Sequence, residues 1–477
     1  MFISFIACAR ALGSTKAVLH GTLTPVTMTV TNANSTTIAP VRQKLSGYDF
    51  YRQVLGSPRY IVAPMVDQSE HAWRVLSRRY GGQLCYTPMF HARMFSDPVN
   101  GHKYRAEQWS TDAQDRPLIV QFCANEPEHL LSAAKLVESD CDAVDLNLGC
   151  PQHIAKRGHY GSFLQDEWDL VHNLISTLNT DLSIPVTAKI RVFPTIEKTV
   201  AYAKMIERAG AQMLVVHGRL RDQKGHKTGL ADWDAIRAVK QAITSIPVIA
   251  NGNILYHEDL QRCLDYTGCD GVMTAEGNLY NPAILASSEL PHTWAMAEEY
   301  LGICREFPTR LSPIRAHLFK ILQPSLPHHT DLRTRLSKAG TFDEVWDIVA
   351  ELKVRLMEDE VRIGEEGMGE RDELGYKKVP YWRCQPYFRP ELPADNGASG
   401  SKRKKEVGEM EEVMEERTQQ KKRGTEEGKI AEDEECVKKV KEFATVEVAS
   451  GRISKGFVDY CTLQDVVQSV QTENSRI

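Results

Sequence analysis

The chain has 477 residues and a formal net charge of -5, with 42% hydrophobic and 25% charged residues. These fractions are typical of globular proteins, so they exclude a fibrous or wholly disordered chain, and the length allows one large domain with appendages. The small net charge gives no sign of nucleic-acid binding for the chain as a whole. No apolar run reaches the length of a membrane span, so we expect no membrane partner.

The cysteines give no sign of a metal or disulfide framework. Eleven of them are scattered without a CxxC pair or a Cys/His cluster at zinc-ligand spacing. An odd number without framework spacing predicts reduced thiols in an intracellular protein. His328 and His329 lie beside Asp331, but Pro327–Thr330 is typical of a polar loop, so we expect no structural metal.

The first 48 residues contain no acidic residue and many Ser and Thr residues. This composition resembles an organelle transit peptide, although arginines are few and residues 22–37 have no amphipathic helical period. Two interpretations of residues 1–48 stay open, a disordered leader and a mitochondrial targeting segment. Otherwise we expect a cytoplasmic protein, with a nuclear location left open by the basic run Lys402–Lys405.

From Arg59 onward, short apolar runs rich in Val, Ile or Leu recur between Pro, Gly or Asn residues, as buried parallel strands do. Most intervals between them have the apolar spacing of helices, and we expect Asp166 and Asp232 to cap two of these helices. The interval His91–Arg116 is polar and contains Pro98 and Gly101, which indicates an insertion rather than a long helix. The expected strands are Tyr60–Asp67, Leu84–Phe90, Pro117–Ala124, Ala143–Pro151, Pro185–Val192, Met213–Arg219, Pro247–Ile254 and Gly271–Gly277.

Eight strand–helix units predict an α/β fold, a closed (β/α)₈ TIM barrel over residues 49–291. An open doubly wound sheet has the same periodicity, but the eightfold count and the polar strand ends favour the barrel. Residues 292–365 have helical apolar spacing without strand signals and predict a small all-helical domain. Residues 366–395 are interpreted as a Pro- and aromatic-rich linker and 396–442 as a charged disordered tail, whereas 443–477 remain unassigned.

Polar residues follow the expected strands, at the catalytic face of such a barrel. The fourth expected strand leads into Gly149–Pro151, which would hold the thiol of Cys150 on a constrained turn facing the pocket. An isolated cysteine is more commonly a buried structural residue, and the turn is what favours a functional one here. Lys189 lies inside the fifth expected strand, where a buried lysine needs an anionic partner.

The last two expected strands end in loops that contain glycine, Asn251–Asn253 and Ala275–Gly277. Glycine allows backbone N–H groups to approach phosphate oxygens, and this is the usual phosphate site of TIM barrels. Together with Lys189 and His217, these loops predict a phosphorylated cofactor. The breadth of the pocket suits flavin mononucleotide, FMN.

The strand-end motifs resemble those of the tRNA-dihydrouridine synthases, in the same order across the whole expected barrel. Cys85–Phe90 and Gln152–Gly161 are most similar to the eukaryotic branch that acts on tRNA D-loop positions 16 and 17. The resemblance implies an FMN-binding barrel, a helical domain that docks tRNA, and an NAD(P)+-dependent enzyme that takes electrons from NADPH or NADH. We expect a monomer. The matching motifs are Ala63–Asp67, Gln121–Asn125, Asp145–Pro151, Ala188–Arg191, Val216–Arg219, Asn251–Asn253 and Met273–Asn281.

The resemblance also implies roles for single residues. Cys150 would be the catalytic acid that protonates C5 of the uracil while the reduced flavin delivers hydride to C6, and Asn147 would orient the base. A thiol with an ordinary pKa is mostly protonated at neutral pH, so it can donate a proton without activation. Gln121 would contact the isoalloxazine edge, and Lys189 its N1/C2 side. Pro64, Met65 and Val66 would line the flavin, and the ribityl phosphate region would be held by His217, Asn251, Gly252, Asn253, Ala275 and Glu276.

Basic residues outside the cofactor loops predict a surface for tRNA phosphates. Lys156 and Arg157 follow the cysteine turn, and Arg315 and Lys320 lie on one expected helix of the helical domain. A solvated charged face explains the charges equally well, and the resemblance is what favours RNA contact. The same expectation applies to His317, Arg333 and Arg335.

Two alternative functions stay open. An FMN-dependent barrel oxidoreductase of a small diffusible substrate would explain the cofactor loops, but not the helical domain with its basic residues. A non-catalytic RNA-binding barrel would explain the basic residues, but it would not need Cys150.

Overall fold

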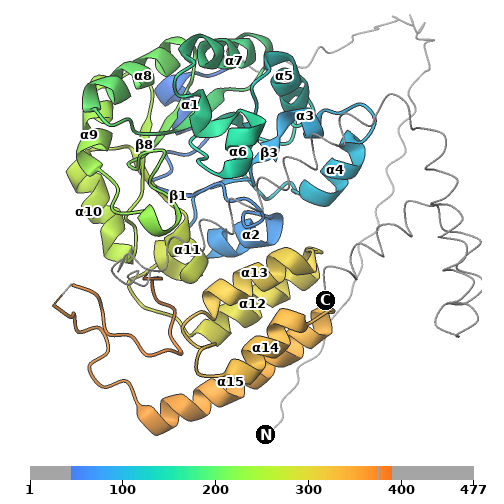
Figure 1. Cartoon of the computed structure of the whole chain (residues 1–477), viewed down its shortest axis with the longest axis vertical. Coiled ribbons are helices and arrows are strands. Elements are labelled where there is room, and N and C mark those ends of the chain that lie inside the picture. Colours follow the sequence, from blue (N-terminus) through green and yellow to red (C-terminus); the bar gives the residue numbers. More distant parts are fainter. Residues whose placement is uncertain (1–43, 374, 389–477) are drawn as a thin grey trace, which may run out of the picture. The chain divides into compact units, whose positions relative to one another are not determined.

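The computed structural model describes residues 44–373 and 375–388. At its centre, β1 pairs with both β2 and β9, and β2 pairs with β4, so that eight parallel strands close into a barrel (Figure 1). The eight predicted strands are confirmed, and a two-residue strand that the sequence did not predict, β3 (Phe90–His91), pairs with β4 in addition. The barrel strands are β1 (Tyr60–Val62), β2 (Leu84–Tyr86), β4 (Leu118–Cys123), β5 (Ala143–Leu148), β6 (Val186–Arg191), β7 (Leu214–His217), β8 (Val248–Asn251) and β9 (Gly271–Thr274).

Helices cover the outside of the barrel and connect successive strands (Figure 1). The longer ones are α2 (His71–Arg79), α5 (Pro127–Lys135), α7 (Trp168–Asp181), α8 (Ile196–Arg208), α9 (Trp233–Ala242) and α10 (His257–Thr267). The shorter elements are α1 (Gly47–Gln53), α6 (His153–Gly158), η1 (Gly161–Leu164), η2 (Gly225–Lys227), α11 (Glu276–Tyr280) and η3 (Pro282–Leu285).

The two predicted helix caps have different outcomes. Asp232 caps α9, because its side chain accepts a hydrogen bond from the backbone N–H of Ala235 at 2.9 Å. The prediction for Asp166 was wrong. The residue preceding α7 is Glu167, which makes no side-chain cap, and the carboxylate of Asp166 instead pairs with Lys198 and Arg221, each at 3.3 Å.

The interior of the barrel changes from apolar to polar along its strands. Alternate residues of a strand share a face, so Ala143, Asp145 and Asn147 of β5 point inward together. Ala143 packs with inward residues of the other strands, and Phe50 of α1 joins that cluster, so α1 closes the N-terminal end of the barrel. The polar members of the inward set therefore collect at the opposite, C-terminal end.

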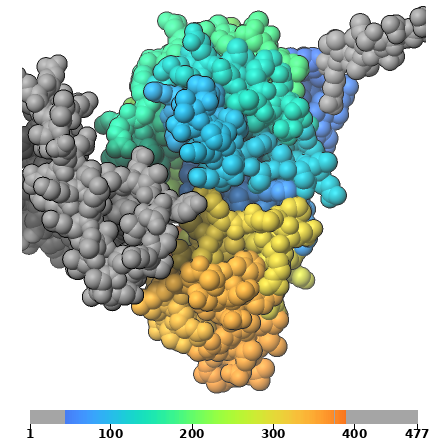
Figure 2. Space-filling model, turned by 90° about the vertical axis from the view of Figure 1, so that its right-hand side faces the viewer, coloured from blue at the N-terminus to red at the C-terminus, as the bar shows by residue number. Residues whose placement is uncertain are grey.

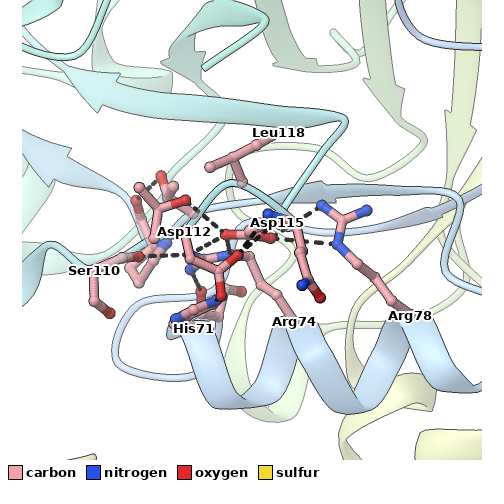
Figure 3. A network of polar contacts seen from close by, with 12 residues as sticks. His71, Arg74, Arg78, Ser110, Asp112, Asp115 and Leu118 are labelled. Carbon is pink, nitrogen blue, oxygen red and sulfur yellow. Dashed lines mark hydrogen bonds and ion pairs between the residues drawn. The ribbon is translucent and has the colours of Figure 1, made fainter. Parts of the chain in front are cut away.

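The interval after β3 is a folded insertion, as predicted, with the two short helices α3 (Ala92–Phe95) and α4 (Gly101–Gln108). A buried charge network attaches its end to α2 (Figure 3). The guanidinium of Arg74 donates two hydrogen bonds to Oδ2 of Asp115, at 2.9 and 2.6 Å, and Arg78 reaches Oδ1 of the same carboxylate at 3.1 Å. Arg74 also donates to the carbonyl of Ser110 at 2.7 Å. The network fixes the end of the insertion to α2.

The predicted all-helical domain is present and comprises α12 (Thr293–Glu306), α13 (Leu311–Ile321), α14 (Thr330–Lys338) and α15 (Phe342–Ile363). It packs on α2 through aromatic rings. The ring of His317 on α13 stacks on Trp73 with centroids 3.8 Å apart, and its Nε2 lies 2.9 Å from the carboxylate of Glu70. His317 is fully buried, so its assignment to the tRNA surface was wrong.

The segment expected to be a linker is packed over its described residues. Trp382 and Cys384 are buried, and the N–H of Thr293 donates to the carbonyl of Trp382 at 2.8 Å. The N–H of Lys377 donates to the hydroxyl of Tyr256 on the barrel at 3.0 Å. Up to Tyr387, this segment therefore joins the barrel to the helical domain rather than spacing them apart.

The expectations for the chain ends concern residues that the structure does not describe. Residues 1–43, most of the leader, and the tail segments 396–442 and 443–477 lie outside the described residues. The cytoplasmic, nuclear and mitochondrial locations therefore stay predictions. Among the described residues, no helix has the length and apolarity needed to cross a membrane.

Candidate active site at the barrel mouth

Buried polar side chains of β4, β5 and β6 form one hydrogen-bonded group inside the barrel. The side-chain N–H of Gln121 donates to Asp145 at 2.8 Å, and the hydroxyl of Thr187 donates to the other carboxylate oxygen at 2.6 Å. Oε1 of Gln121 accepts from Nδ2 of Asn147 at 2.8 Å. Burial raises the pKa of Asp145 to about 6, although the hydrogen bonds from Thr187 and Gln121 oppose that shift, so the carboxylate is mostly ionised at pH 7.

The turn that bears Cys150 is fixed through its backbone. Oδ1 of Asn147 accepts from the N–H groups of Gly149 and Cys150, at 3.1 and 2.9 Å. The carbonyl of Cys150 accepts from both the N–H and the hydroxyl of Ser162, at 3.1 and 3.0 Å. A Cβ at Gly161 would lie 2.8 Å from that carbonyl, and the φ of +67° there also requires glycine. These contacts fix the backbone from which the thiol projects.

Two cations that the sequence analysis left without a role hold the same turn from the other side. Nε of Arg191 donates to the carbonyl of Gly149 at 2.9 Å, and its Nη1 donates to the carbonyl of Leu220 at 2.8 Å in the loop after β7. Nζ of Lys224, in that loop, donates to the carbonyl of Pro151 at 2.7 Å. Long side chains that donate to backbone carbonyls have no spacing pattern, so no sequence signal could have identified them.

The thiol of Cys150 is half-buried beside Cys123 and Tyr160. Burial raises the pKa of Cys150, and this effect outweighs the opposing influence of the nearby cations Arg191 and Lys189. The group is therefore a neutral thiol at physiological pH. A protonated thiol suits a proton donor better than a nucleophile, because nucleophilic cysteines need the thiolate.

A second polar cluster lies at the ends of β6, β7 and β8. Nζ of Lys189 donates to Oδ1 of Asn251 at 2.9 Å, and burial together with the charge of Arg191 lowers the pKa of Lys189 to about 8. Burial also holds the pKa of His217 well below its usual value, so the ring is neutral and its Nε2 accepts from Arg219 at 3.1 Å. A buried amine whose hydrogen-bond partner is a neutral amide favours an anion nearby.

The loops expected to hold a phosphate contain glycines that their packing requires. Gly252 has a φ of +119°, and a Cβ there would lie 2.6 Å from the Cβ of Ala231. A Cβ at Gly277 would lie 2.5 Å from the carbonyl oxygen of Ile254. Asn253 has a φ of +63° and exchanges two hydrogen bonds of 2.8 Å with the backbone of Ala231. A tight glycine-containing loop at the end of a barrel strand can present backbone N–H groups to a phosphate group.

The remaining expected cofactor residues follow β1 and β9. Pro64 and Met65 are partly buried, whereas Val66 is 58% exposed. The N–H of Met65 donates to the hydroxyl of Ser69 at 2.9 Å, which fixes this loop at the barrel mouth. Ala275 and Glu276 begin α11 directly after β9.

Four of the residues expected to bind tRNA lie in different settings. Lys156 and Arg157 are exposed on the last turn of α6, directly after the cysteine turn. Lys320 is partly buried, and burial lowers its pKa against the opposing charge of Glu276 at the barrel mouth. The guanidinium of Arg315 donates to the carbonyls of Ser337 and Ala339, at 3.3 and 2.9 Å, where it closes the end of α14.

Polar groups that resemble metal ligands have partners of their own in the described part of the chain. Ligand atoms of His292, Glu360 and Glu365 lie within 4.8 Å of one another. The guanidinium of Arg383 already pairs with both carboxylates, at 3.4 and 2.7 Å. His329 lies 3.1 Å from the carboxylate of Asp359.

Comparison with known proteins places these motifs among relatives. A family model described as dihydrouridine synthase matches residues 61–362. The chain is 50% identical over 386 residues to the tRNA-dihydrouridine(16/17) synthase [NAD(P)(+)] of Saccharomyces cerevisiae, with 76% of this chain and 89% of that protein covered. Identity to the Schizosaccharomyces pombe protein of the same name is 51% over 374 residues, covering 74% and 93%. A Mus musculus protein named as similar to that enzyme is 52% identical over 375 residues, covering 77% of each chain.

Proposed function

Because the chain belongs to the dihydrouridine synthase family, we propose that it reduces the C5–C6 double bond of uridines at positions 16 and 17 of tRNA. The position follows the names of the relatives from both yeasts. The observation that supports this function most directly is the turn of Cys150. Its backbone is held on both sides, and it presents a neutral thiol at the barrel mouth.

FMN is the proposed cofactor, with NADPH or NADH as the source of its electrons. The described residues fit it in two respects, the buried cation of Lys189 and the glycine-built loop at Gly252. Lys189 would face the negative charge of the reduced ring, and Gln121 its edge. Gly252 and the neighbouring loop residues would hold the phosphate.

The residues of the chain have separable tasks in this reaction. When bound, reduced FMN supplies the hydride that adds to C6 of the uracil. Cys150 donates the proton of its Sγ to C5, and solvent then restores the thiol. Lys189 would stabilise the negative charge of the reduced ring. Asn147 holds the thiol in place through its contacts with the turn.

The tRNA is proposed to bind between the barrel face and the helical domain. A groove of about 390 Å³ lies there, lined by the end of α4, by Trp109, by the connection from α12 to α13 and by the acidic residues Asp67, Glu70 and Glu107. Figure 2 shows the insertion next to the helical domain on this face, and Arg310 joins them by a hydrogen bond of 3.2 Å to Gln108. Lys156 and Arg157 would meet phosphates nearer the thiol. Arg315 is better explained as a support of α14.

Reaction with unmodified tRNA tests the proposed function. The purified chain, supplied with FMN and NADPH, should form dihydrouridine at positions 16 and 17 of a transcribed tRNA, as mapped by sequencing or mass spectrometry. Modification at other positions would reassign the target uridine. A yellow protein that oxidises NADPH with a small enone substrate but leaves tRNA unmodified would instead favour a small-molecule reductase.

The lowered pKa of Lys189 predicts how flavin binding depends on pH. Over the pH range in which the reduced flavin is anionic, it favours the charged amine, so its affinity should be constant up to about pH 8 and fall by up to about tenfold per pH unit above it. Lys189→Met should bind more weakly and lose this dependence. Anaerobic calorimetric titration of reduced FMN into the apoprotein measures both quantities.

Lys204→Met is the matched control, because that lysine is exposed on the outer helix α8. It should keep the affinity and pH profile of the wild type. An unchanged profile in Lys189→Met would show that another group faces the reduced ring.

A further inference from the structure

The amides of Gln121 and Asn147 form a directed chain of hydrogen bonds from Asp145 to the cysteine turn. Each amide donates toward Asp145 and accepts from the side of Cys150. The distances along the chain are 2.8, 2.8 and 2.9 Å, and Asp145 and Gln121 are almost completely buried. Water therefore cannot substitute easily for the two contacts made by Gln121.

The two ends of the chain require the same direction. An ionised carboxylate only accepts hydrogen bonds, so Asp145 requires the N–H side of the Gln121 amide. Oε1 of Gln121 then faces Asn147, whose Nδ2 must donate to it. This leaves Oδ1 of Asn147 for the N–H groups of Gly149 and Cys150, which can only donate. If either amide were reversed, two donors or two acceptors would face each other.

We propose that Asp145 is a positioning residue that sets the direction of this chain and thereby holds the Cys150 turn in place for proton donation. The inference deepens the proposed function and rests on it. Asp145 lies two residues before Asn147 on β5, so it acts through the two amides rather than by contact with substrate. The charged and titratable groups nearest to it are Lys189 on β6 and Tyr86 on β2, and Thr187 donates to its second oxygen.

Asp145→Asn removes the fixed direction, because an asparagine can present either its oxygen or its N–H group to Gln121. The side-chain oxygen of Asn147 would then no longer face the Cys150 N–H at all times, because the orientation of the Asn147 amide follows that of Gln121. The turn should loosen, and the thiol should become more accessible. We expect the rate of Cys150 alkylation by iodoacetamide in the FMN-bound protein to rise about fivefold, the factor that corresponds to about 1 kcal/mol, one neutral hydrogen bond. Mass spectrometry of the peptide that contains Cys150 measures the rate without tRNA turnover, so the result is independent of whether the protein modifies tRNA.

A rescue variant separates direction from general damage. In Gln121→Glu combined with Asp145→Asn, the carboxylate moves one place along the chain. The asparagine donates to it, and Asn147 still donates to it from the other side. Gln121→Glu alone places two carboxylates in contact and should also perturb the turn. The double variant should return the rate of Cys150 alkylation to within about twofold of the wild-type rate. Such a non-additive effect is characteristic of residues that interact.

Thr274→Val is the matched control, because its hydroxyl is buried in the same barrel but has no hydrogen-bond partner among the described residues. Its alkylation rate should equal that of the wild type. A wild-type rate in Asp145→Asn, or a double variant that is worse than both single variants, would overturn the proposal. If Asp145→Asn does not fold, recovery of a folded double variant supports the proposal, and failure of the double variant to fold contradicts it.

Discussion

Replacing Cys150 with alanine is expected to lower the rate of dihydrouridine formation by about a hundredfold or more, the usual contribution of a positioned general acid. The variant should still bind FMN and tRNA, because the contacts of the turn involve the backbone of Cys150 and not its thiol. Single-turnover reduction of transcribed tRNA by the prereduced enzyme isolates the chemical step. A loss in this assay, together with an unchanged flavin spectrum, would assign the defect to proton transfer.

Cys263→Ala is the matched control for this experiment. Cys263 is a buried free thiol on α10, outside the barrel, whereas Cys150 is half-buried at the barrel mouth. Its removal should leave the single-turnover rate close to that of the wild type. If Cys150→Ala kept the wild-type rate as well, another group would have to protonate C5.

The pH dependence adds a second criterion, because the raised pKa of Cys150 predicts a wild-type rate that falls only above the usual pKa of a thiol.

The barrel could be predicted from the sequence because its strands are buried on both faces and produce continuous apolar runs. The strand β3 was missed because two residues are too few to form a pattern. The cap of α7 was misassigned because the sequence offers two acidic residues in succession. Asp166 is held by Lys198 and Arg221, tertiary partners that local rules do not include.

The candidate site was predictable as far as the ends of the strands and no further. Cys150, Lys189 and Asn251 follow directly from the strand positions. Arg191 was visible in a motif, but its role depends on carbonyls in two loops that only the closed barrel brings together. His317 illustrates the opposite error, since a histidine between surface cations gives no sign that it stacks on Trp73.

Asp115→Ala is expected to cause the largest loss of stability, about 3–5 kcal/mol in the free energy of unfolding. The side chain of Asp115 has no exposed surface and that of Arg74 is 1% exposed, so the variant would leave a buried guanidinium without its counter-charge (Figure 3). Burial alone would raise the pKa of Asp115, but the charges of Arg74 and Arg78 outweigh it and hold that pKa below its usual value. The contribution of the carboxylate is therefore fully present above about pH 4, its range in the unfolded chain, and is lost as the pH falls through the lower value of the folded protein.

Urea unfolding of the variant at pH 7, compared with Asp331→Ala, tests this expectation. Asp331 also pairs with an arginine, Arg355, but on the surface, so its removal should change the unfolding midpoint far less. Adding Arg74→Met to Asp115→Ala should restore part of the lost stability, because the unpaired buried charge is then gone. If the double variant were as unstable as the sum of its single variants, the network would stabilise the insertion by packing rather than by charge pairing. Asp115 and Arg74 would then contribute to the stability of the insertion independently of each other.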